Sequence, residues 1–85
     1  FDEWFEELCE ADMLVIDEVD KIRFSDRTQA EFFELLERRC SNIYSNTIFT
    51  SNVPADELAA FMDPKYQDAT LRRLKEFFVP MKFTR

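Results

Sequence analysis

Short apolar runs alternate with longer amphipathic stretches along the chain, and this pattern predicts an α/β fold. Four consecutive apolar residues at 13–16 predict a strand over about residues 12–17 that is buried on both faces of a parallel sheet. A second strand is predicted over about residues 46–51. Alternation over residues 77–83 predicts a third strand, which Pro80 restricts to an edge of the sheet.

Helical spacing of apolar residues predicts helices between and after these strands. The predicted helices cover about residues 1–9, 27–40, 54–62 and 67–76. Asp26, with Gln29 three positions later, fits a capping box at the start of the second helix, and Asn42 is expected to end that helix in the left-handed conformation. The charged side chains of this helix, Arg38 and Arg39 among them, are expected to form its solvated face.

The predicted element order, β–α–β–α–α–β, is typical of a parallel sheet with helical crossovers. Asp17 and Glu18 follow the first strand, and Ser51 and Asn52 follow the second. Because the carboxyl ends of parallel strands lie at one edge of a sheet, we expect these polar residues to meet there and to form a site.

Asp17 and Glu18 have the residue types that such a site requires. A buried carboxylate without compensation is costly, so two adjacent acids at the end of an apolar strand favour a ligand site over packing. One acid can hold Mg²⁺, and its neighbour can polarise an attacking water. This is the form of a Walker B element, although a plain strand followed by an acidic turn has the same pattern.

The 85 residues contain no glycine, and this limits what such a site can do alone. Loops that cradle phosphates need glycines so that backbone N–H groups can approach the anion. Neither G-x-x-x-x-G-K-[ST] nor G-x-G-x-x-G can occur here. If Asp17 and Glu18 are a Walker B element, the matching Walker A loop is therefore not on this chain.

Composition and charge exclude several classes of protein. A chain of 85 residues forms one small domain at most, and its net charge of −7 argues against a general nucleic-acid or anionic-membrane surface. No apolar run approaches the roughly 20 residues of a membrane span, so we expect no membrane partner. Cys9 and Cys40 lack metal-ligand spacing, and the chain has no His; two reduced thiols are expected, as in a cytoplasmic protein.

Three motifs in this order resemble the AAA+ ATPases, and within them the bacterial helicase-loader group (the DnaC/IstB-like ATPases). Residues 8–18 (LCEADMLVIDE) are similar to the Walker B surroundings of the family, and residues 47–52 (TIFTSN) look like its sensor-1 strand. Residues 68–74 (DATLRRL) look like the segment that carries the arginine finger. The resemblance covers nearly the whole chain but only the second half of the ATPase module. It implies that residues 1–85 are a partial domain, the C-terminal part of a three-layer P-loop NTPase core.

The resemblance implies a role for each matching residue. Asp17 and Glu18 would bind the metal, with Asp17 supporting Mg²⁺ and Glu18 activating the hydrolytic water. Asn52 would be sensor 1, which orients that water beside the γ-phosphate. Arg73 aligns with the finger that acts in trans on ATP held by a neighbouring subunit, a contribution of several orders of magnitude in rate. Arg72 stands where relatives often have an acid, so either arginine could be the one that points at the nucleotide.

The resemblance also implies cofactors and partners. ATP and Mg²⁺ would serve the full-length parent protein, whereas this chain alone is expected to bind neither tightly and to hydrolyse no ATP. The implied partners are a replicative helicase or another replication or transposition protein, single-stranded DNA through the full-length protein, and further copies in an AAA+ assembly.

A missing P-loop strand has consequences for the sheet. The first two strands are expected to pair directly, while residues 77–83 would lack their usual neighbour. That segment could pair with the second strand, pair with another copy of the chain, or detach, because unpaired buried backbone is costly. An open sheet edge also favours oligomerisation.

Other hypotheses remain open from the sequence. The chain could be a non-enzymatic interaction module that kept the fold, with its site residues as remnants. A metal-dependent hydrolase using Asp17, Glu18 and Asp20 would require Asp20 to turn back toward the site. Asn52 could be a turn or helix-cap residue, and the Arg72–Arg73 pair could be part of a solvated helix face.

Overall fold

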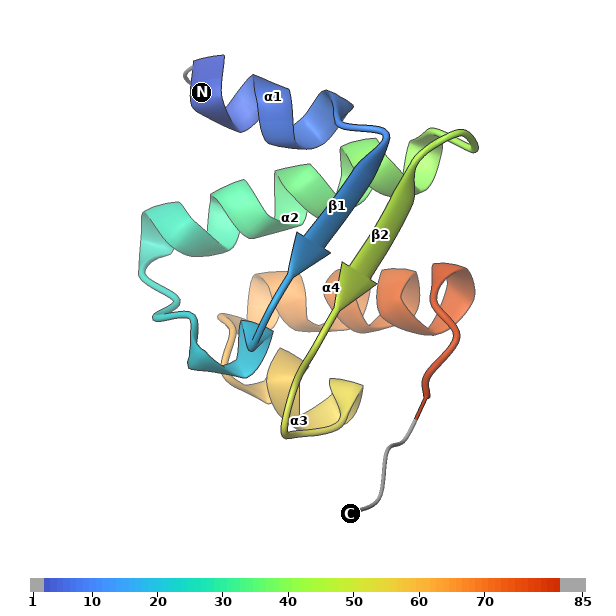
Figure 1. Ribbon diagram of the computed structural model, residues 1–85. Helices are drawn as coiled ribbons and strands as arrows, with labels where there is room; N and C mark the ends of the chain where they lie inside the picture. The colour runs from blue at the N-terminus through green and yellow to red at the C-terminus, as the bar shows by residue number, and fades with distance from the viewer. Residues whose placement is uncertain (1–2, 82–85) are drawn as a thin grey trace.

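The computed structural model describes residues 3–81, in which two parallel strands lie in front of the helices Asp26–Ser41 and Pro64–Phe77 (Figure 1). In chain order the elements are α1 (Glu3–Glu10), β1 (Met13–Ile16), the 3₁₀ helix η1 (Val19–Lys21), α2 (Asp26–Ser41), β2 (Asn46–Phe49), α3 (Ala55–Ala60) and α4 (Pro64–Phe77). This architecture confirms the predicted α/β fold class with a parallel sheet and a helical crossover, and it is consistent with a fragment of a P-loop NTPase fold. Among residues 3–81, every helix is too short or too polar to span a bilayer.

β1 and β2 pair directly and in parallel, as predicted. Met13 lies opposite Asn46, and Ile16 lies opposite Phe49. Because both strands run in the same direction, their carboxyl ends lie at the same edge of the sheet, where η1 follows the first strand (Figure 1).

Only one face of this sheet is covered by the described part of the chain. Leu14 is buried against α1 and α2, on the side toward which Ile16 also packs. On the opposite face Val15 is 56% exposed and Ile48 is 48% exposed. The prediction that the first strand is buried on both faces is therefore wrong for residues 3–81, because the helices pack on one side alone.

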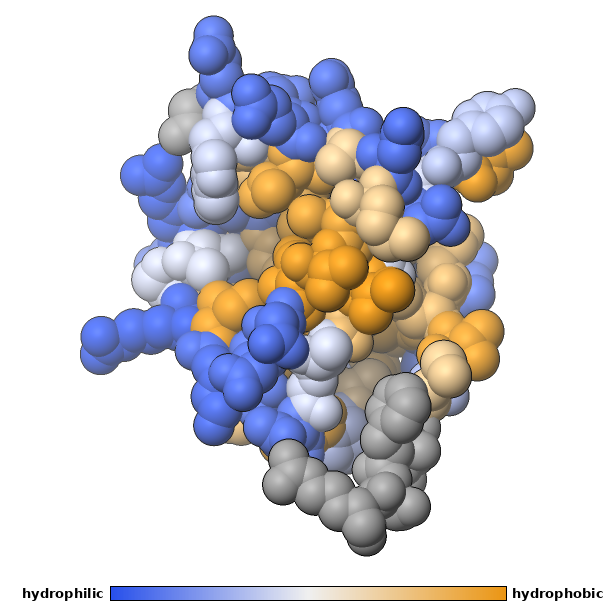
Figure 2. Space-filling view, viewed as in Figure 1, coloured by the Kyte–Doolittle hydropathy of each residue, from blue (hydrophilic) through white to orange (hydrophobic). Residues whose placement is uncertain are grey.

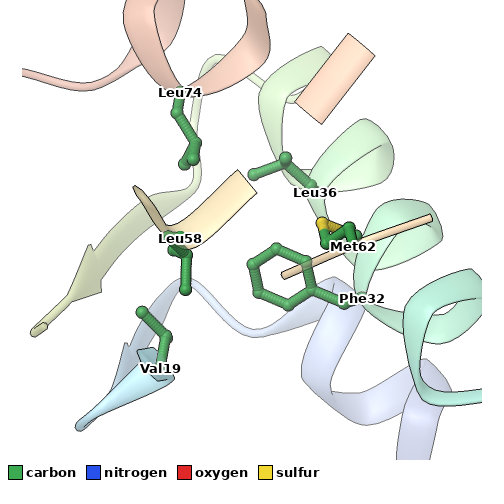
Figure 3. Close-up of a cluster of buried hydrophobic side chains, with 6 residues drawn as sticks. All are labelled: Val19, Phe32, Leu36, Leu58, Met62 and Leu74. Carbon is green, nitrogen blue, oxygen red and sulfur yellow. The ribbon is translucent and has the colours of Figure 1, made fainter. Parts of the chain in front are cut away.

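Two clusters of apolar side chains fix the helices on the covered face. The larger one, drawn in Figure 3, comprises Val19, Phe32, Leu36, Leu58, Met62 and Leu74. The smaller one comprises Phe5, Cys9, Leu14 and Leu35. Burial of such a side chain contributes about 1.5–3 kcal/mol, so the larger cluster holds α3 and α4 against α2. Val19 belongs to it and is 1% exposed, which anchors the turn that follows β1.

A buried arginine connects the amino ends of the strands. Arg39 of α2 is 3% exposed, so its predicted place on a solvated helix face is wrong. Its guanidinium donates to the carbonyl oxygens of Leu8 (2.9 Å), Ala11 (2.7 Å) and Asn46 (2.9 Å) and to Thr47 Oγ1 (2.6 Å). No carboxylate within residues 3–81 forms an ion pair with it. Burial lowers the pKa of Arg39, and carbonyls at the carboxyl end of α1 supply the compensating negative potential.

The start of α2 differs from the predicted capping box. Ser25, rather than Asp26, is the cap residue, and its Oγ accepts the N–H of Thr28 at 3.3 Å. Gln29 is buried, and its side-chain oxygen accepts the N–H of Asp63. The amide of Gln29 therefore joins α2 to the segment before α4 and does not close a box on its own helix.

Two further helix ends also differ. Asn42 has a φ of −105° and is not left-handed; its N–H and the Ser45 hydroxyl both donate to the Arg39 carbonyl oxygen in the last turn of α2. α4 begins at Pro64, three residues before the predicted start. Asp63 caps it by accepting the N–H of Lys65 at 3.2 Å, and proline suits the first helical turn, where its missing N–H is not needed.

The predicted third strand does not form within residues 77–81. Phe77 is the last residue of α4, since the helical periodicity of that segment continues through it. The ring of Phe78 stacks on that of Phe49, with centroids 5.1 Å apart. A strand needs a neighbour for its backbone hydrogen bonds, and no described strand pairs with this segment. Residues 82–83 of the predicted strand lie outside the described residues.

Candidate functional site

The hydrogen bonds between β1 and β2 continue to Thr50, one residue past β2. At this point the chain after β1 contains one residue more than a regular parallel pairing would have. The Thr50 N–H donates to the Ile16 carbonyl at 3.0 Å, and the Thr50 carbonyl accepts the Val19 N–H at 2.8 Å. In a regular parallel ladder that carbonyl would accept the N–H two residues after Ile16, which is Glu18. Asp17 and Glu18 therefore form a bulge with one extra residue.

Glu18 adopts the left-handed conformation in this bulge. Its φ and ψ are 53° and 54°, and it has the one positive φ among residues 3–81. That conformation costs a non-glycine residue roughly 1–2 kcal/mol. Its N–H donates to Thr50 Oγ1 at 2.7 Å, in place of the carbonyl that Val19 has taken. The bulge leaves the Glu18 side chain exposed at the end of β1.

The Thr50 hydroxyl joins the two acids. Because its oxygen accepts the N–H of Glu18, its own proton is directed to Asp17 Oδ1, to which the hydroxyl donates a hydrogen bond. The Glu18 carboxylate is exposed and has no ion-pair or hydrogen-bond partner among the residues that the structure describes. Thr50 therefore orients one carboxylate and leaves the other free for a ligand.

A further hydrogen bond joins the two loops, and here the side chain comes from the loop after β1. Asp20 of η1 accepts the backbone N–H of Asn52 at 3.1 Å through Oδ1. Asn52 is exposed, and its side-chain amide has no partner within residues 3–81. The structure thus brings the predicted Asp17, Glu18 and Asn52 to one edge of the sheet.

The donor set at this edge fits a hard cation. Asp17 and Glu18 offer carboxylate oxygens, the ligand type that Mg²⁺ prefers. Asp20 does turn back toward the loop after β2, but its carboxylate holds the Asn52 N–H. Among the described residues no group of three or more His, Cys, Asp or Glu could hold a metal ion.

The backbone at this edge offers little to a phosphate. The N–H groups of Glu18 and Val19 donate to Thr50, and that of Asn52 donates to Asp20. A phosphate cradle requires such N–H groups to be free and to point at the anion. These three groups are therefore unable to serve as one.

The two predicted finger arginines lie on α4 and do not contact the strand ends. Arg73 donates to both carboxylate oxygens of Glu37 on α2, from Nε at 2.8 Å and Nη2 at 3.1 Å. Hydrogen bonding with Glu37 raises the pKa of Arg73, and its guanidinium lies 5.9 Å from the Phe77 ring centroid. Arg72 is exposed and has no partner within residues 3–81.

Sequence reasoning missed the roles of Thr50 and Asp20 at this edge. Thr50 lies within the sensor-1-like motif of residues 47–52, but it is not one of the predicted site residues. Phe49 lies opposite Ile16, and Thr50 directly follows Phe49. This position places the Thr50 hydroxyl beside the residues that follow β1. Nothing in the sequence indicates that Asp20 accepts the Asn52 N–H.

Comparison with known proteins gives one family-level result. A family model described as "IstB-like ATP binding protein" matches residues 1–78. No curated protein and no solved structure matches the chain. The matched stretch contains both strand ends and α4, and therefore all the predicted site residues.

Proposed function

The chain belongs to the family of IstB-like ATP binding proteins, and on that premise we propose that it is the C-terminal part of an AAA+ ATPase core of the helicase-loader type. The family relates the chain to AAA+ ATPases and to nucleotide binding. In the complete protein, ATP binding and hydrolysis would change the grip on a replicative helicase, on another replication or transposition protein, or on single-stranded DNA. Such a protein would work in the cytoplasm.

The observation that carries this proposal is the meeting of Asp17, Glu18 and Asn52 at one sheet edge. Asp17, oriented by Thr50, would support Mg²⁺. Glu18 has a free carboxylate, which is what a base needs to take a proton from the hydrolytic water. Asn52 would orient that water beside the γ-phosphate with its free amide. Mg²⁺ would supply charge stabilisation for the phosphates when bound.

The arginines of α4 would act on a neighbouring subunit. Neither Arg72 nor Arg73 contacts Asp17 or Glu18 of its own chain, since Arg73 binds Glu37 and Arg72 has no partner within residues 3–81, and this supports a role in trans. Arg73 aligns with the family finger and would exchange Glu37 for a phosphate when subunits assemble. Arg72 is exposed and needs no such exchange, so it is the second candidate for the same role.

Two features support a partial site and a partial domain. The chain has no glycine, so the Walker A loop would come from outside these 85 residues. Figure 2 shows hydrophobic side chains gathered over β1 and β2, where the exposed Met13, Val15 and Ile48 lie. Parallel sheets in α/β proteins are covered on both faces, and the Walker A half would cover this one.

ATP hydrolysis by the complete open reading frame that encodes this chain tests the proposal. Glu18→Gln removes the base while keeping the shape of the side chain, and it is expected to lower turnover by about 10²-fold or more. Glu7→Gln on α1 is the matched control, because Glu7 is exposed and far from the strand ends in the sequence. Turnover in Glu18→Gln equal to that of the control would contradict the proposal.

The open sheet face also favours a second candidate function. A non-enzymatic interaction module would use the exposed Val15 and Ile48 to bind a protein partner, with the acids as remnants. A complete reading frame that neither binds nor hydrolyses ATP would favour this function over the first.

A further inference from the structure

Two hydrogen-bonded connections cross between the loops that follow β1 and β2, and each loop supplies the bridging side chain of one of them. From the loop after β2, the Thr50 hydroxyl binds Asp17 Oδ1 and the N–H of Glu18. From the loop after β1, the Asp20 carboxylate binds the N–H of Asn52. We call these five residues the strand-end clasp. Each loop in it holds a predicted site residue of the other.

We infer that Thr50 and Asp20 are positioning residues of the ATPase site, which keep the acids after β1 and the asparagine after β2 in one register. This inference rests on the proposed function, since Asp17, Glu18 and Asn52 have their roles from it. Neither Thr50 nor Asp20 is assigned a contact with nucleotide or metal. They act through the residues that they hold.

The chemistry of Thr50 explains why a hydroxyl is required there. Because of the bulge, the Thr50 carbonyl accepts the N–H of Val19 instead of that of Glu18. The Glu18 N–H therefore needs another acceptor. A hydroxyl can accept this N–H and donate to Asp17 at the same time, whereas a methyl group can do neither. Serine keeps both hydrogen bonds, and valine removes both at nearly constant volume.

The place of Asp20 is fixed by its neighbour in the chain. Val19 is 1% exposed in the larger core cluster, which holds η1 close to the end of β2. Asp20 is half-buried there, and its Oδ1 lies 3.1 Å from the Asn52 nitrogen. Asn52 lies two residues after Thr50, so both connections act on the same short segment. Release of one is therefore expected to loosen the other.

Amide hydrogen exchange measured by NMR on the 85-residue chain tests this coupling. Thr50→Val is expected to speed exchange at the Glu18 N–H by about tenfold, as expected for the loss of one hydrogen bond, and also to speed exchange at the Asn52 N–H. Thr50→Ser is expected to stay near the wild-type rates. Ser51→Ala is the matched control, because the Ser51 hydroxyl bonds only within its own loop, to Val53.

A variant of Asp20 tests the same coupling from the loop after β1. Asp20→Ala is expected to speed exchange at the Asn52 N–H and at the Glu18 N–H, while Asp20→Asn keeps an acceptor and changes both less. Changes confined to the directly bonded amide in both Thr50→Val and Asp20→Ala would overturn the coupled clasp.

Kinetics of the complete reading frame separate positioning from a structural role. Thr50→Val is expected to lower kcat by about tenfold with KM for ATP unchanged, and Thr50→Ser is expected to restore kcat. An unchanged kcat in Thr50→Val would overturn the inference. A wild-type protein without ATPase activity would instead overturn the proposed function, and the exchange rates would still decide whether the clasp exists.

Discussion

At the amino ends of β1 and β2 the chain buries a cation, and at their carboxyl ends it exposes two anions. Arg39 is 3% exposed and uses its guanidinium on backbone carbonyls and on Thr47. Asp17 and Glu18 are exposed, and the Glu18 carboxylate has no partner within residues 3–81. One end of the sheet is built for stability, while the other keeps polar groups free, as ligand sites of open α/β sheets do.

The largest effect is expected from Arg39→Met at the amino ends. This change keeps an unbranched side chain but removes the Arg39 donors from the carbonyls of Leu8, Ala11 and Asn46, which should lower the free energy of unfolding by about 3 kcal/mol or more. A chain of this size has only roughly 4–13 kcal/mol in total. Urea denaturation followed by circular dichroism measures the loss.

Arg38→Met is the matched control for this prediction. Arg38 forms ion pairs with Glu6 and Glu34 on a partly exposed surface, and its loss is expected to cost less than about 1 kcal/mol. Equal losses in the two variants would contradict the contrast between a buried network and a surface pair.

A smaller effect of opposite sign is expected at the carboxyl ends. Glu18→Gly is expected to stabilise the chain by about 0.5–1 kcal/mol, because glycine adopts a φ of 53° without the Cβ penalty. Glu18→Ala removes the same carboxylate but keeps the Cβ, so it should bring no such gain. A comparison of urea midpoints for the two variants measures the strain. Equal midpoints would show that the bulge stores none.

The smallest effect concerns a thiol near the Arg39 network. Burial raises the pKa of Cys9 above its ordinary value of 9.0, so the folded state retains the proton at a pH where the unfolded state releases it. This contribution to stability is complete below about pH 9 and is lost as the pH rises through the folded pKa. Burial also raises the pKa of Cys40, so both thiols contribute to the same loss.

Denaturation curves at pH 7 to 11 measure this loss. Cys9→Ala is expected to flatten the decline of stability above pH 9 by less than about 1 kcal/mol, and the double variant with Cys40→Ala should flatten it further. A decline of the same slope in all three proteins would assign it to other groups.

The sequence was sufficient for features that depend on periodicity and direction. Both strands were predicted within two residues of their observed bounds, and their parallel pairing places Asp17 and Asn52 at one edge as expected. Local patterns could not reveal the left-handed Glu18, because its conformation depends on a hydroxyl 32 positions away in the chain. The prediction for Arg39 was wrong for the same reason. Helix periodicity assigns this residue to a charged face, and only the carbonyls of α1 and β2 explain its burial.

The prediction of a third strand was wrong because two patterns overlap in the same segment. Residues 77–81 alternate in a way typical of a strand, but the helical pattern of α4 extends to Phe77. Strand formation also depends on a neighbouring strand, which no local pattern can supply, and β2 has no second partner among the described residues.

Calorimetric titration with Mg-ATP tests whether the carboxyl ends of β1 and β2 form half of an ATP site. The complete reading frame and the 85-residue chain are titrated side by side under the same conditions. We expect a micromolar dissociation constant for the complete protein, a binding free energy on the order of −8 kcal/mol, and no measurable heat of binding for the chain alone. Micromolar binding by the 85-residue chain, which has no glycine for a phosphate loop, would contradict this expectation.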